Sequence, residues 1–175
     1  MMLLGSALTA GACMSAQAAA PTEYEVKAAF IYNIAKYVEW PAAVRTSGPL
    51  NLCILGRNPF GNALEALRGQ PVGDKVWEVL PVQPNTNLSK CGVLFIAASE
   101  SNNLGQILDD LKNTVVLTIG DTNGYAEQGV MVNFYSEHNR VRFEINNDAA
   151  GRAGLKISSQ LLKLARIVAE PRGKQ

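Results

Sequence analysis

The chain is short of histidine and cysteine, the residues that most often supply catalysis and metal binding. Its single histidine, His138, falls in an expected hairpin turn, and its three cysteines are far apart. A zinc site needs clustered His, Cys, Asp or Glu, and a hydrolase needs a nucleophile beside an activating base. We therefore predict no catalytic residue, no metal ligand and no cofactor, and we expect that the protein is not an enzyme.

The chain also lacks an excess of charge of either sign. The 16 Lys and Arg residues nearly balance the 15 Asp and Glu residues, which leaves a net charge of +1. This balance gives no reason to expect binding to nucleic acid or to an anionic membrane. The sequence has no apolar run of about 20 residues, the length that spans a bilayer. Its 175 residues suffice for one domain.

A phosphate-binding loop is suggested but incomplete. Gly56 and Gly61 have the spacing of such a loop and lie between a predicted strand and a predicted helix. Asn62 and Ala63 stand where the loop needs Lys and then Ser or Thr. We interpret the segment as a turn that requires two glycines, with anion binding at the following helix as the alternative.

Residues 1–18 are predicted to be a signal peptide. We expect that the true start of this signal peptide lies a little upstream of Met1. Residues 1–20 carry no charge, and Ala16-Gln17-Ala18 fits the small-x-small pattern of a cleavage site. The positive segment that normally opens a signal peptide is missing. We expect cleavage after Ala18 and a location in the periplasm. The alternatives are a lipoprotein cut before Cys13 and a disordered cytosolic tail.

Removal of this leader leaves two cysteines, Cys53 and Cys91. An even pair in an exported chain is a candidate disulfide, and this one would close a loop of about 38 residues. Two buried thiols are the alternative.

The pattern of apolar residues predicts a single α/β domain over residues 21–170, followed by a flexible tail at 171–175. Alternating elements with continuous apolar strands favour a mostly parallel sheet flanked by helices on both faces, with a C-terminal hairpin and helix. In chain order, helices are predicted at 23–40, 60–68, 102–111 and 149–169, and strands at 50–55, 75–82, 93–98, 115–119, 130–135 and 140–145.

For the first and last predicted helices, the sequence also predicts which residues are buried. Thr22 is the expected N-cap of the first helix and Pro41 its expected end. The apolar stripe of the first helix is predicted to be Val26, Ala29, Phe30, Ile34, Tyr37 and Val38. The last helix is predicted to bury Ile157, Leu161, Leu164, Ala165 and Val168 and to expose Arg152, Lys156, Lys163 and Arg166. That basic side is a solvated face, or alternatively a docking surface for an acidic partner.

Trp40 is a candidate interface anchor. It stands at the end of the predicted first helix, next to Glu39 and just before Pro41. Tryptophan contributes a large contact area at modest entropic cost and is frequent among the residues that dominate interfaces. The alternative is that Trp40 covers an edge of the core.

Seven segments in order resemble the YfiR family, and together they cover nearly the whole chain after the leader. They are residues 26–41 (VKAAFIYNIAKYVEWP), 54–56 with 59–61, 91–96, 117–121 with 124–125, 129–131, 141–146 (VRFEIN) and 155–165 (LKISSQLLKLA). Each segment is weak alone, but their order is specific.

The resemblance implies a periplasmic, non-enzymatic α/β sandwich that can dimerise. Proteins of this kind repress a YfiN-like membrane diguanylate cyclase by binding its periplasmic part, and an OmpA-like, YfiB-like outer-membrane lipoprotein sequesters them. Release of the cyclase raises cyclic di-GMP and promotes biofilm formation. We therefore expect a periplasmic repressor. The alternative is a small-molecule-binding protein that serves a sensor or transporter.

The resemblance also carries over to particular residues. Cys53 and Cys91 match a family disulfide, whereas cysteines for a second family disulfide are missing. The region of Phe143, Glu144, Ile145 and Asn146 matches one linked to cyclase binding. Trp40 with Glu39 is our second predicted contact surface.

Overall fold

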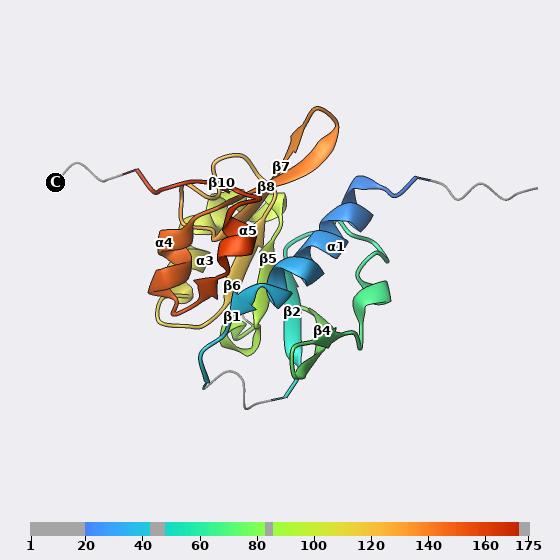
Figure 1. Ribbon diagram of the computed structural model, residues 1–175. Helices are drawn as coiled ribbons and strands as arrows, with labels where there is room; N and C mark the ends of the chain where they lie inside the picture. Colours follow the sequence, from blue (N-terminus) through green and yellow to red (C-terminus); the bar gives the residue numbers. More distant parts are fainter. Residues whose placement is uncertain (1–19, 43–47, 83–85, 172–175) are drawn as a thin grey trace, which may run out of the picture.

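The computed structural model describes residues 20–42, 48–82 and 86–171, which fold into one α/β domain (Figure 1). A sheet of eight strands forms its centre, and most neighbouring strands are parallel. Their spatial order is β10 (Arg166–Ile167), β8 (Arg140–Ile145), β7 (Val132–Glu137), β6 (Leu117–Gly120), β5 (Val93–Ile96), β2 (Leu50–Leu55), β4 (Lys75–Pro81) and β3 (Pro71–Val72). A separate two-stranded sheet pairs β1 (Val38–Glu39) with β9 (Lys156–Ile157). The predicted fold class is confirmed.

The central strands are buried on both faces. All four residues of β5 are buried, and so are all four of β6, as their continuous apolar sequences predict. One face packs against α1 (Glu23–Lys36), α4 (Asn147–Arg152) and α5 (Ser159–Leu162). The other face packs against α3 (Leu104–Asp110). The prediction of helices on both faces is thus correct.

Helix α1 begins as predicted but ends earlier. Thr22 caps it, because its hydroxyl accepts a hydrogen bond from the Glu25 backbone N–H and the Glu25 side chain accepts one from the Thr22 N–H. The predicted end at Trp40 is wrong, since the chain leaves the helix at Tyr37 and enters β1. Antiparallel pairing of Val38 with Ile157 offers the backbone partners that replace the last helical turn.

The predicted stripe of α1 is also displaced. Ala29 and Tyr37 are exposed, and Val26 and Phe30 are only half-buried. The buried residues of the helix are Lys27, Ala28, Ile31, Ile34 and Ala35. The buried face therefore includes Lys27, whose ion-pair partner Asp121 directly follows β6.

The C-terminal hairpin is confirmed, with a shorter turn than predicted. Strand β7 runs on to Glu137, so only His138 and Asn139 form the turn. Both have positive φ, 49° and 57°, as a two-residue turn matched to the twist of the flanking strands requires. In Figure 1 the hairpin projects from the body of the domain.

The predicted last helix, 149–169, is wrong. The segment is divided into α4, β9, α5 and β10. Gly154, at a φ of +76°, ends the first piece, and Ser158 begins α5 by capping the Leu161 N–H. Ile157 and Leu161 are buried as predicted, whereas Leu164 is 75% exposed and the predicted basic side does not exist as one helix face.

Smaller differences affect the other elements. Residues 60–68 form turns and a short 3₁₀ segment, Glu65–Leu67, instead of a helix, with Leu64 buried and Leu67 half-buried. Strand β3 pairs antiparallel with β4 and is not predicted from the sequence. The predicted leader 1–18 and most of the predicted tail lie outside the described residues. Among the described residues, no helix combines the length and hydropathy needed to cross a bilayer.

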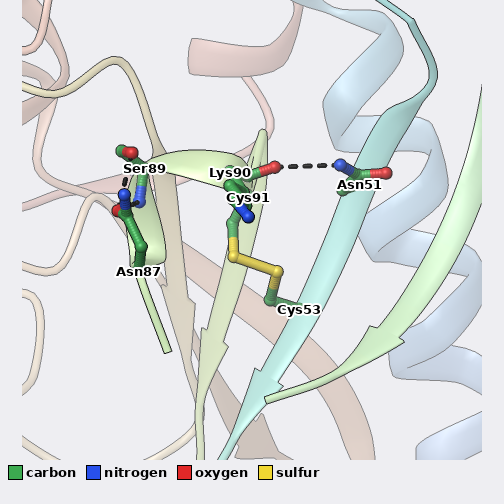
Figure 2. The surroundings of a disulfide bond; sticks show 6 residues. All are labelled: Asn51, Cys53, Asn87, Ser89, Lys90 and Cys91. Atoms are coloured by element: carbon green, nitrogen blue, oxygen red, sulfur yellow. Dashed lines mark hydrogen bonds between the residues drawn. A yellow bond between two sulfur atoms is a disulfide. The ribbon is translucent and has the colours of Figure 1, made fainter. Parts of the chain in front are cut away.

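The disulfide Cys53–Cys91 is present and joins two neighbouring parallel strands (Figure 2). Cys53 lies within β2, and Cys91 stands two residues before β5. The Asn51 side chain donates a hydrogen bond to the Lys90 carbonyl, 2.9 Å away, beside the bridge. Both cysteines are buried against the α3 face of the sheet.

Removing the bridge is expected to destabilise the protein by up to roughly 4 kcal/mol, because a 38-residue separation is no longer closed in the unfolded chain. Urea unfolding of the Cys53→Ala/Cys91→Ala variant measures this loss. Alkylation of the denatured, unreduced wild-type protein should label neither cysteine. Two labelled thiols in the exported protein would contradict the bridge.

Candidate functional site: a partner surface beside the hairpin

A buried carboxylate lies at the base of the β7–β8 hairpin. Glu144 is 2% exposed and sits opposite Asn133 in the β7–β8 register. Its Oε1 accepts a hydrogen bond from Asn133 Nδ2 at 2.9 Å, and its Oε2 accepts one from Arg166 Nε at 3.0 Å. The carboxylate is therefore partnered on both oxygens, as burial of a charge requires.

Glu144 holds Arg166 in a defined position at the surface. Arg166 comes from edge strand β10, and its guanidinium lies 4.2 Å from the centre of the Tyr135 ring. The hydrogen bond with Glu144 raises the pKa of Arg166, although burial acts in the opposite direction. The Arg166 side chain is still 55% exposed, so an oriented cation is presented next to an aromatic ring.

Asn146 connects the end of β8 to the C-terminal segment. Its Oδ1 accepts a hydrogen bond from the Ala149 N–H and so caps α4. Its Nδ2 donates to the Ala126 carbonyl at 2.8 Å and to Glu170 at 3.3 Å. Glu170 also pairs with Arg152. Asn146 is therefore buried and has a structural role, so its side chain is not available for direct contact with a partner.

The predicted contact residues at the end of β8 are all buried. Phe143 packs its ring 5.8 Å from that of Phe30, and Ile145 lies in the core. Glu144 and Asn146 are engaged as described above. Their exposed neighbours form the surface here, and Arg166 is the one that a predicted residue, Glu144, holds directly.

The second predicted surface lies elsewhere. Glu39 is exposed in β1, and the half-buried Trp40 follows it. Both line a hollow of about 370 Å³ together with Lys36 and Asp74. The structure does not bring this hollow together with the end of β8, and Figure 1 shows β1 well apart from the hairpin tip.

Sequence reasoning missed Asn133 and Tyr135. It names Arg166 as part of an exposed basic helix side, alternatively a docking surface, but the residue lies in strand β10 and pairs with Glu144, 22 residues away in sequence. A signal was nevertheless present for Asn133, a polar residue within an otherwise apolar strand segment opposite the acidic residue of the next strand.

A second ion pair, with both side chains buried, connects α1 to the residue that follows β6. Lys27 Nζ donates to Asp121 Oδ2 at 2.8 Å, and the side chains of both residues are nearly inaccessible. The Tyr24 hydroxyl donates to the same oxygen at 3.0 Å. Burial alone would lower the pKa of Lys27, but hydrogen bonds to Asp121 and Glu23 outweigh it and raise that pKa. Burial, and then the charge of Asp121, raise the pKa of Tyr24.

Comparisons with known proteins agree with this architecture. A family model described as YfiR/HmsC-like matches residues 24–166. Among solved structures, the chain is similar to a conserved domain protein from Vibrio cholerae O1 biovar El Tor, with 11% identity and a TM-score of 0.58 over 85% of this chain. It is also similar to the ABC domain in complex with L-Trp from Streptococcus pneumonia, with 9% identity and a TM-score of 0.55 over 83% of this chain. The chain spans 60% of the length of each structure, and the likeness concerns the fold.

Replacing Arg166 with Met should lower the free energy of unfolding by about 1–3 kcal/mol, because the buried Glu144 carboxylate loses its charged partner. Arg140→Met, an exposed arginine at the start of the same strand β8, is the control and should change stability by less than about 0.5 kcal/mol. Urea unfolding of both variants makes the comparison. Equal, small effects would show that Glu144 does not depend on Arg166.

The ion pair of Lys27 predicts a loss of stability in alkali. Lys27 and Tyr24 both hold their protons more tightly in the folded protein. The contribution of these two groups to the free energy of unfolding should therefore be fully present below about pH 10, near their pKa values in the unfolded chain. It should be lost as the pH rises through their pKa values in the folded protein. Urea unfolding between pH 8 and 11.5 measures this fall.

Lys27→Met should remove roughly 3–5 kcal/mol at neutral pH, because a buried carboxylate loses its cation, and should remove the Lys27 contribution to the alkaline fall while that of Tyr24 remains. Lys36→Met changes an exposed lysine of the same helix and serves as the control. An unchanged pH profile in Lys27→Met would contradict the assignment.

Proposed function

The chain belongs to the YfiR/HmsC-like family, and from this membership we propose that it is a periplasmic, non-enzymatic regulator of a membrane diguanylate cyclase. It binds the periplasmic part of a YfiN-like cyclase and represses it, which limits cyclic di-GMP and biofilm formation. The observation that carries the proposal is the extent of the match, since residues 24–166 include all of the described helices and strands except the first residue of α1 and the last of β10.

Two further features support a periplasmic location. The disulfide Cys53–Cys91 is of the kind that persists in oxidising compartments such as the periplasm. Residues 1–18 have the composition of a signal peptide, with cleavage after Ala18.

The proposed cyclase-binding surface is the exposed side of the hairpin and its neighbour β10. It is defined here by Tyr135, Arg140, Arg142 and Arg166, whose side chains share one face of the sheet by the strand register. The three arginines are exposed, and Tyr135 is half-buried. Glu137 is the acidic residue closest to Arg142, at 3.9 Å. The surface thus combines an aromatic ring with three arginines, which fits an acidic partner segment.

Within this proposal the four predicted residues of β8 act from beneath the surface. Glu144 positions Arg166, and Phe143, Ile145 and Asn146 hold the strand to α1 and α4. Glu39 and Trp40 form the second contact surface. An OmpA-like, YfiB-like lipoprotein and a second copy of this chain are the further partners that we propose.

A small-molecule-binding protein that serves a sensor or transporter is the second candidate. One of the similar structures is an ABC domain that was determined in complex with L-Trp, so a fold of this kind accommodates a small ligand. The two candidates differ in what accompanies the protein in the cell.

In-cell crosslinking of the tagged, exported protein should recover a membrane diguanylate cyclase with a periplasmic domain. Arg142→Glu should reduce that recovery at least tenfold, because it reverses a charge at the centre of the proposed surface, and should raise cyclic di-GMP. Lys90→Glu is the matched charge reversal at an exposed site near the disulfide. Recovery of no cyclase with the wild-type chain, together with unchanged cyclic di-GMP on deletion, would refute the proposal.

A further inference from the structure

The β7–β8 hairpin has an open edge on its β8 side. Edge strand β10 pairs with β8 only at Glu144 and Ile145. Among the described residues, no strand pairs with positions 140–143 on that side, although β7 pairs with them on the other side. In Figure 1 this part of the hairpin projects from the body of the domain, so the edge is open to a partner. We name residues 140–143 the β8 edge.

The backbone of the β8 edge offers hydrogen-bonding groups to a partner. The Ile145 carbonyl accepts a hydrogen bond from the Val168 N–H at 2.9 Å, so the polar groups of Ile145 point away from β7. In an antiparallel pair such as β7–β8, this direction alternates along the strand. Val141 therefore also directs its N–H and carbonyl away from β7, and Phe143 directs its N–H there. Such groups on a strand edge form a template for an added strand.

Arginine side chains make the β8 edge positive. Arg140 and Arg142 flank Val141 on one face of β8, and Arg166 of β10 lies on the same face. All three arginines are exposed. Glu137 of β7, 3.9 Å from Arg142, is the exposed carboxylate beside them. Charged residues on a strand edge deter pairing with most other strands, and this charge favours an acidic one.

The opposite face of the β8 edge is apolar. Val141 is half-buried and packs against the core, and Phe143 is buried beside it. Phe30 of α1 is also half-buried, with its ring 5.8 Å from that of Phe143. Successive side chains of an added strand point to opposite faces of the sheet. A fitting strand therefore has acidic residues on the arginine face, and these alternate with apolar residues on the Val141 face.

A second copy of this chain does not fit the β8 edge. Antiparallel pairing of two such edges centred on Val141 would set Arg140 of each copy opposite Arg142 of the other copy. Like charges directly opposite each other destabilise a strand pair. The arginines therefore select a strand from a different protein.

We propose that the β8 edge binds an extended segment of the partner protein as an added strand, in which acidic residues alternate with apolar ones. The acidic side chains pair with Arg140 and Arg142, the apolar ones cover Val141, and main-chain hydrogen bonds to Val141 supply further affinity. This inference rests on the proposed cyclase-binding surface and specifies how that surface holds its partner.

The first test is a nuclear magnetic resonance titration of the isotope-labelled, exported protein with a seven-residue peptide of alternating glutamate and valine. The backbone N–H signals of Val141 and Phe143 should shift, whereas that of Ser136, on the opposite edge of the hairpin, should not. A peptide of alternating lysine and valine should bind at least tenfold more weakly. No binding of the acidic peptide would overturn the proposal, and so would equal binding of the basic one.

Two methylated peptides test the main-chain hydrogen bonds. Methylation of the valine nitrogens removes the donors that face Val141 in an antiparallel added strand, and methylation of the glutamate nitrogens removes those of a parallel one. One of the two peptides should bind at least tenfold more weakly than the parent peptide. Equal binding of both would show attraction by charge alone, which overturns strand addition and leaves the cyclase-binding surface standing.

Proline variants separate this inference from the proposed function. Val141→Pro removes the outward N–H and keeps the arginines, and Ser136→Pro is the matched change at the position directly opposite, whose N–H points to the other edge. In cells, Val141→Pro should recover at least tenfold less crosslinked cyclase than Ser136→Pro, with thermal unfolding confirming that both variants fold. Equal recovery would overturn strand addition and leave the regulatory proposal standing. If the wild-type chain recovers no cyclase, the regulatory proposal fails, and the peptide titration of the wild-type protein still decides strand addition.

Discussion

The requirement that a parallel sheet be covered on both faces governs this structure. Strand β5 has no residue that reaches water, and its neighbours β2 and β6 are nearly as buried. Helix α1 must therefore lie over one face and α3 over the other. The connections after β2 and β5 run to opposite faces to supply this cover, and a hollow lined by residues that follow β2, β5 and β6 lies where they separate.

Two ion pairs connect elements of the fold, and each contains at least one buried charged side chain. Lys27–Asp121 joins α1 to the end of β6, and Glu144–Arg166 joins the edge strand β10 to β8. Removing charges from water costs several kcal/mol for each ion, so such pairs contribute little net stability. Their contribution is geometric: one sets the rotation of α1, and the other directs an exposed guanidinium over Tyr135.

Helix α1 connects two parts of the sheet. Near its N-terminus, Tyr24 lines a hollow beyond the ends of β2, β5 and β6. Two turns later, Phe30 packs against Phe134 and Phe143 at the base of the hairpin. One helix therefore connects this hollow with the strands that carry the proposed cyclase-binding surface. On the opposite, α3 face, the disulfide joins β2 to the segment before β5.

The sequence by itself determined the central strands, the start of α1, the hairpin, the cysteine pair and the family. These features depend on local signals: continuous apolar runs, the Thr22 capping box, turn residues and ordered motifs. Only the tertiary structure decided where α1 ends, how it is rotated and how residues 149–169 are divided. In those places long-range partners outweigh local preference. Val38 pairs with Ile157, Lys27 with Asp121, and Arg166 with Glu144. These partners are too far apart in the sequence for a local pattern of residues to predict their contact.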